Sequence, residues 1–99
     1  MPVLALFTGR LTKAQYDTLR REVDWETKQP AGAIFHAASF DDEGQIHVAD
    51  VWATADQLNA FAQNHLMPAF TRHGITPPSV AVYPTHNVQA YAAVSQYRI

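Results

Sequence analysis

The sequence predicts an α+β protein of the ferredoxin-like type, with a four-stranded antiparallel sheet and two helices on one of its faces. Three observations lead to this fold class. Apolar segments with strand periodicity and segments with helical periodicity follow one another in the order βαββαβ. A T-x-x-Q capping pattern, at Thr12 and again at Thr54, opens both helical segments. An acidic turn, Asp41–Gly44, joins the two middle strands as an antiparallel hairpin.

The individual elements follow from periodicity and from their start and stop signals. The expected strands are Val3–Phe7, Ala33–Phe40, Gln45–Trp52 and Ser79–Tyr83. One helix is expected from about Lys13 to about Glu22, and a second from Thr54 to about His73, where Gly74 caps it. The tail, residues 85–99, has no clear alternation and receives no secondary structure. Right-handed crossovers then place both helices on the same side of the sheet.

Length and composition narrow the function classes. The 99 residues form one domain, residues 1–99. A net charge of −2 with dispersed basic residues argues against nucleic acid as a partner. There is no cysteine, and no apolar run is long enough for a signal peptide or a membrane span, so we expect a cytoplasmic protein with no membrane partner. No metal-ligand spacing, phosphate loop or dinucleotide fingerprint occurs, so no metal and no cofactor is expected.

The strands predict a homodimer. They are apolar at successive positions, as strands buried on both faces are, yet two helices can cover only one face of the sheet. A second copy of the chain is the simplest cover for the other face. The tail, residues 85–99, is then a candidate for the dimer interface.

Two polar side chains stand where the patterns call for apolar ones. Asp50 lies in the middle of a strand, and His65 lies seven residues after Leu58 on the apolar stripe of the second helix. An imidazole there can act as a general acid or base, or can be a partly buried histidine bonded to a backbone carbonyl. Asp50 can orient that imidazole or act as a base itself, or can bond at the dimer interface to a backbone N–H or to an arginine of the partner. His65, His36 and Asp50 are therefore the candidate catalytic residues.

A pocket between helix and sheet should border these residues. His36 is the strand residue best able to meet His65, and His86 is the loop residue best able to close over it. We expect at least two of these three histidines to line one pocket within a single subunit. Trp52, Phe61, Tyr83 and His86 are the candidate substrate-binding residues, although the aromatic side chains also fit a packed core.

The run Ala33–Phe70 resembles small proteins of the dimeric α+β barrel superfamily, most nearly the uncharacterised antibiotic-biosynthesis-monooxygenase-like domains. The shared features are His36 in a strand, the D-D-x-G hairpin, the D-V-W that ends at Trp52 and the L-M-P-A that ends at Ala69. The resemblance implies a cofactor-independent monooxygenase or a cyclase/isomerase that acts on a small aromatic or polyketide-like compound by His-based proton transfer. The alternative is a non-catalytic dimeric module that binds a small hydrophobic or aromatic molecule.

Overall fold

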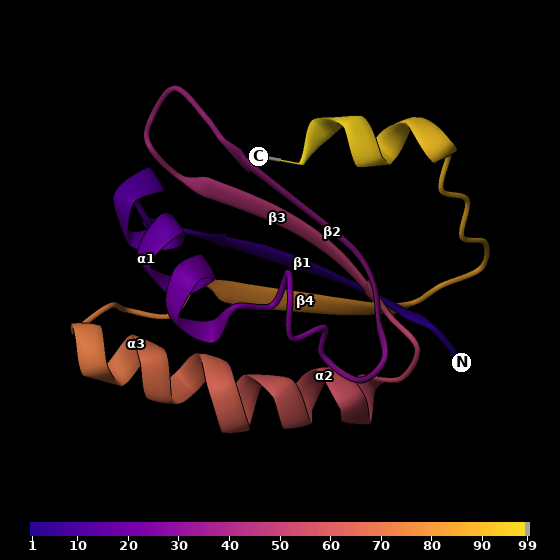
Figure 1. The fold of residues 1–99 in the computed structure, drawn as a ribbon, viewed down its shortest axis with the longest axis horizontal. Coiled ribbons are helices and arrows are strands. Elements are labelled where there is room, and N and C mark those ends of the chain that lie inside the picture. The colour runs from indigo at the N-terminus through magenta and orange to yellow at the C-terminus, as the bar shows by residue number, and fades with distance from the viewer. Residues whose placement is uncertain (99) are drawn as a thin grey trace.

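The computed structural model describes residues 1–98 and contains the predicted sheet. Its four strands are all antiparallel, in the order β2-β3-β1-β4, and α1, α2 and α3 cover one face (Figure 1). The elements are β1 (Val3–Gly9), α1 (Lys13–Val23), β2 (Ala33–Phe40), β3 (Ile46–Trp52), α2 (Ala55–Phe61), η1 (Ala62–Leu66), α3 (Met67–His73), β4 (Ser79–Pro84) and η2 (Ala92–Tyr97). This is the ferredoxin-like arrangement, so the predicted fold class is confirmed. Across residues 1–98, no helix is both long enough and apolar enough to cross a bilayer.

The turn between β2 and β3 is held by Asp41, as the acidic D-D-E-G segment suggests. Its carboxylate accepts the backbone N–H groups of Glu43 and Gln45, each at 2.9 Å. Gly44 takes a positive φ of 79°, which a residue with a Cβ adopts only with strain. Gln45 belongs to this turn, so β3 starts one residue later than predicted. The turn sets the register that places His36 opposite Asp50.

Both helical starts use their threonine, but in different ways. At Thr12 the capping box is complete. The Thr12 hydroxyl accepts the backbone N–H of Gln15, and the Gln15 side-chain oxygen accepts the backbone N–H of Thr12. At Thr54 the hydroxyl accepts the Gln57 N–H at 3.1 Å, but the Gln57 side-chain oxygen accepts the threonine hydroxyl instead of a backbone group. The T-x-x-Q pattern therefore located both helix starts, and only the first has the full reciprocal cap.

The second predicted helix contains a turn of π-helix and is not α-helical throughout. In η1 the N–H of Met67 bonds to the carbonyl of Ala62, five residues earlier. A π turn takes up one residue more than an α turn, so every later side chain rotates by about 100°. Leu66 and Phe70, rather than His65, therefore continue the stripe that starts at Leu58.

The core consists of two apolar clusters on the helix-covered face of the sheet. One lies under α1 and α3 and includes Ile46 and Phe70; the other lies under α2 and includes Trp52 and Leu58. Along β3 the inward positions run Ile46, Val48, Asp50 and Trp52. Asp50 is thus a buried carboxylate at the boundary between the two clusters.

The edge strand β4 is exposed, and so is part of the other face of the sheet, although Val51 of β3 is buried there. Every residue of β4 is exposed, and Leu6 of β1 also faces away from the helices. The tail leaves the end of β4 and turns back, so that its 3₁₀-helix η2 (Ala92–Tyr97), yellow in Figure 1, lies on the side opposite α2 and α3. Tyr91 and Tyr97 in this tail expose 73% and 79% of their surface. The structure thus leaves uncovered the apolar face for which the sequence predicts a second copy.

Candidate functional site

Asp50 is the buried centre of a hydrogen-bonded group. It exposes only 8% of its surface, and one carboxylate oxygen lies 2.6 Å from Nδ1 of His36, its partner across the strands. The other oxygen accepts the indole N–H of Trp52 at 3.2 Å. Both oxygens are therefore satisfied, which is what a buried carboxylate requires.

Tyr16 extends this group on the other side of His36. Its hydroxyl lies 2.7 Å from Nε2 of the imidazole, and the two rings are parallel to within 1°. With the Nδ1–H donated to Asp50, Nε2 keeps its lone pair and accepts the Tyr16 hydroxyl. We call the chain Tyr16–His36–Asp50–Trp52 the His36 network. It joins α1 to β2 and β3.

Aromatic rings enclose the imidazole. The ring of Trp25, from the segment after α1, lies 5.4 Å from that of His36 and 5.7 Å from that of Tyr16. Phe40 meets Tyr16 edge-on at 6.1 Å. The His36 side chain is still 34% exposed, so solvent reaches it. An accessible imidazole that a carboxylate orients has the geometry of a general base.

Burial governs the electrostatics of Tyr16. Desolvation raises the pKa of its hydroxyl to about 12, and the nearby negative charges of Glu26 and Asp50 act in the same direction. The positive charge of Arg20 lowers this pKa, but by less than burial raises it. The phenol is therefore a stable hydrogen-bond donor at neutral pH.

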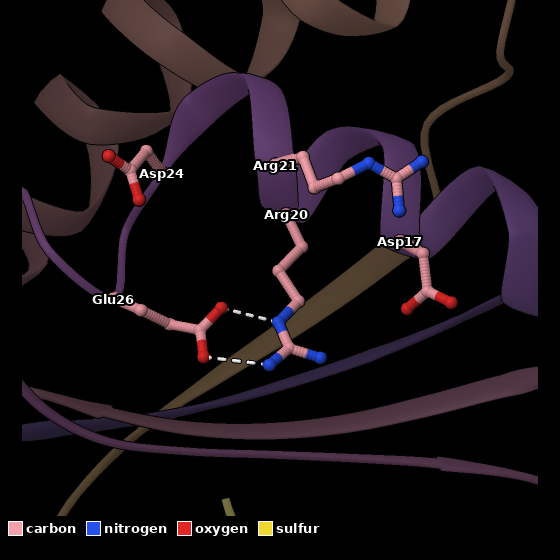
Figure 2. Close-up of a pocket in the computed structure, with 5 residues that line it drawn as sticks. All are labelled: Asp17, Arg20, Arg21, Asp24 and Glu26. Atoms are coloured by element: carbon pink, nitrogen blue, oxygen red, sulfur yellow. Dashed lines mark hydrogen bonds and ion pairs between the residues drawn. The ribbon is translucent and has the colours of Figure 1, made fainter. Parts of the chain in front are cut away.

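A charged depression lies between α1 and the segment that follows it (Figure 2). Arg20 points across it and binds the Glu26 carboxylate through two hydrogen bonds, while Arg21 extends away from the pair. The hydrogen bond from Arg20 holds the pKa of Glu26 below its usual range. The charges of Arg20 and Glu26 neutralise each other within this depression.

His65 lies elsewhere, in a groove of about 560 Å³ that is bordered by the three α-helices, by η1 and by the segment that leads into β2. It is exposed, and its ring lies 5.7 Å from that of Phe61. The groove is lined by Glu22, Val23, Lys28, Gln29, Pro30, Ala31, Gln57, Ala60, Phe61, Asn64, His65, Pro68 and Arg72. The expectation that Asp50 orients His65 is wrong in this structure, because Asp50 binds His36 and Trp52 instead.

The remaining predicted residues are spread over the molecule. Trp52 is buried, and its ring lies 5.3 Å from that of Phe61. Tyr83 is 52% exposed and pairs with Leu4 on the uncovered side of the sheet, and His86 is exposed in the loop after β4. Neither His36 nor His86 lines the groove that holds His65. The catalytic and substrate-binding roles of these residues remain predictions.

Tyr16 is the member of the His36 network that the sequence did not reveal. It occurs at helical spacing with Leu19 and Val23, which is typical of a core position. Only the packing of α1 over β2 brings its hydroxyl to a histidine 20 residues later. Over residues 1–98, no three His, Asp or Glu side chains come together as a metal-binding group would.

Comparison with solved structures gives the fold a family context. Rv0793 from Mycobacterium tuberculosis matches with a TM-score of 0.68 at 12% identity, over 91% of this chain and 100% of its own. A protein from Chloroflexus aurantiacus that is assigned to the antibiotic biosynthesis monooxygenases matches with a TM-score of 0.65 at 14% identity, over 91% and 98%. SnoaB from Streptomyces nogalater, described as a cofactor-independent oxygenase, matches with a TM-score of 0.60 at 14% identity, over 88% and 93%.

This chain has the fold of the antibiotic biosynthesis monooxygenases. The fold that the resemblance implied is therefore confirmed. No family model matches the sequence, and no significant match occurs among curated proteins. At such low identity the likeness concerns the fold, and any activity has to be argued from the side chains of this chain.

Proposed function

We propose that this protein is a cofactor-independent monooxygenase or cyclase/isomerase, in which His36 removes a proton from a small aromatic or polyketide-like compound. The observation that carries the proposal is the His36–Asp50 pair at the boundary between the two core clusters. A buried carboxylate is costly there, and apolar side chains would pack the same space. Asp50 orients the imidazole through Nδ1, and the His36 side chain is 34% exposed.

Oxygenation without a cofactor requires the substrate to supply the electrons. Removal of a proton from an activated C–H or phenolic O–H group leaves an electron-rich enolate or phenolate that can react with O₂. Without oxygen, the same deprotonation starts a ring closure or an isomerisation. One base among aromatic side chains therefore suits both reaction classes. Of the two, oxygenation is the one supported by a similar structure, because SnoaB is described as a cofactor-independent oxygenase.

Anthrone, an aromatic ketone with an acidic methylene group, provides a direct test. Oxidation by O₂ converts its CH₂ group to C=O and releases one water. We expect the protein to accelerate O₂ uptake, and we expect His36→Gln and Asp50→Asn to remove most of the acceleration. His47→Gln is the matched control, because His47 pairs with Asp41 at the hairpin, outside the His36 network. Equal rates for the wild type and His36→Gln contradict the proposal.

A second candidate is the non-catalytic binding module, and the groove next to His65 favours it. Its volume of about 560 Å³ lies within the usual range for small-ligand sites, and a π turn forms part of its wall. Titration with 1-naphthol, followed by NMR, distinguishes the two candidates. Shifts confined to Asn64, His65 and Phe61, without turnover of anthrone, support the binding module.

We further propose that the protein works as a cytoplasmic homodimer joined through the uncovered sheet face and the tail. The chain has 6817 Å² of accessible surface. A monomer of 11.0 kDa typically exposes roughly 5,600 Å². The excess, about 1,200 Å², exceeds the roughly 800 Å² that each partner buries in a standard interface. Light scattering should give twice the chain mass at micromolar concentration; a mass of 11.0 kDa would contradict the dimer.

A further inference from the structure

The lone pair of the proposed base is already occupied. His36 binds Asp50 through Nδ1 at 2.6 Å and Tyr16 through Nε2 at 2.7 Å, so both of its ring nitrogens have partners. A substrate can therefore reach the base in two ways. Either Tyr16 moves aside, or Tyr16 itself takes the proton and passes its own to His36.

The position of Tyr16 favours the second way. Its ring is packed against Trp25 and Phe40 and lies parallel to the imidazole, which opposes a swing away from His36. The phenol oxygen that donates to Nε2 still has lone pairs with which to accept a proton. Burial raises the pKa of Tyr16 to about 12, so the group keeps the hydrogen that the relay needs.

We propose that Tyr16 is a catalytic residue that relays the substrate proton to His36. This inference rests on the proposed function. In the step, the substrate X–H bond breaks and its proton bonds to the Tyr16 oxygen, while the Tyr16 proton moves to Nε2 of His36. The electron pair stays on the substrate, and the Asp50 carboxylate balances the charge of the imidazolium. Tyr16 is neutral before and after, so no free tyrosinate forms.

A proton probe of known chemistry separates the relay from a blocking role. Base removes the C–H proton of 5-nitrobenzisoxazole, the N–O bond breaks, and a coloured cyanonitrophenolate forms without any co-reactant. The full-length wild type is compared with Tyr16→Phe, which keeps the packed ring, with His36→Gln and with the control His47→Gln. If Tyr16 relays the proton, Tyr16→Phe lowers kcat at least about tenfold, and His36→Gln lowers it by a similar factor.

Heavy water gives a second measurement that a structural role would not affect. The C–H proton of the probe does not exchange with solvent, whereas the Tyr16 hydroxyl proton does. Relay through Tyr16 therefore predicts a wild-type rate that is clearly lower in D₂O, and direct removal by His36 predicts a ratio near unity. Thermal unfolding of each variant checks that the fold is retained.

The outcomes are distinct. If Tyr16→Phe is as fast as the wild type or faster, while His36→Gln is inactive, Tyr16 only blocks Nε2; the relay is then wrong and the proposed function stands. If an active wild type reacts equally fast in H₂O and in D₂O, the relay is likewise wrong and the proposed function stands. If the wild type and His36→Gln react equally slowly, His36 is not a base, and both the relay and the proposed function are overturned.

Discussion

Asp50 and His65 are the two polar residues that interrupt apolar patterns, and the fold treats them in opposite ways. Asp50 is 8% exposed and binds His36 and Trp52 through both carboxylate oxygens. His65 is exposed and lies against Phe61 at the rim of a groove. The polar residue in the strand pattern is thus a buried, hydrogen-bonded carboxylate, and the polar residue in the helix pattern is a surface side chain.

The two residues differ in burial because strands and helices determine side-chain orientation in different ways. In a strand, side chains alternate sides strictly, and hydrogen bonds to both neighbouring strands fix the face of Asp50. In a helix, orientation accumulates from turn to turn, so one irregular turn rotates everything that follows. The π turn Ala62–Leu66 lies between Leu58 and His65 and is such a turn.

The largest expected effect comes from changing the residue count of the π turn. Insertion of one alanine after Gln63 should rotate Leu66 and Phe70 out of the core, at a cost of at least about 4 kcal/mol. Deletion of Gln63 is the matched control, because it restores α-helical spacing and leaves both side chains facing inward. Urea unfolding measures both variants. If the insertion is as stable as the deletion, the π turn does not set the orientation of His65.

Removal of the Asp50 carboxylate should have the next largest effect. In Asp50→Ala, the imidazole of His36 and the buried indole N–H of Trp52 both lose their acceptor, which should lower the free energy of unfolding by about 2 to 3 kcal/mol. Asp50→Asn keeps an oxygen acceptor and the side-chain volume, so its loss should be smaller. Urea unfolding of both variants provides the measurement. An alanine variant within about 0.5 kcal/mol of the wild type would mean that the network adds no stability.

The same contrast shows how far the sequence could predict the site. The capping threonines and the Asp41 turn located the helix starts and the hairpin, because each is a local signal. The parity of β3 placed Asp50 on the inward face, but its pairing with His36 depends on a register that only the folded hairpin fixes. Tyr16 meets His36 only because α1 packs over β2, and no pattern within α1 encodes that contact.

A smaller effect on the free energy of unfolding is expected at alkaline pH, at Tyr16 in the network that contains Asp50. Burial raises the pKa of Tyr16 from 10.0 to about 12, so above pH 10 the unfolded chain loses this proton first. The folded state then binds more protons than the unfolded state, and stability falls as pH rises toward 12. The loss should be about 1 kcal/mol after allowance for solvent screening.

Tyr16→Phe removes this titration and is its control. Urea unfolding at pH 9 and at pH 11.5 should therefore show a steeper decline for the wild type than for Tyr16→Phe. Equal declines would mean that the folded and unfolded states bind the Tyr16 proton equally well. The hydroxyl would then be no more buried than in the unfolded chain, and its bond to His36 would be too weak to hold it.

The smallest effect is expected at His65 and is best measured against its neighbour. His65 is exposed, so His65→Leu should change the free energy of unfolding by no more than about 0.5 kcal/mol. Leu66 packs against the core cluster that contains Phe70, so Leu66→Ala should cost about 2 kcal/mol. In a regular α-helix that starts its stripe at Leu58, position 65 would face inward and the order of these two effects would be reversed. Thermal and urea unfolding of the two variants therefore show which of the two side chains faces the core. A large loss in His65→Leu would show that the imidazole stabilises the fold, and the groove would then lose its exposed histidine as a ligand contact.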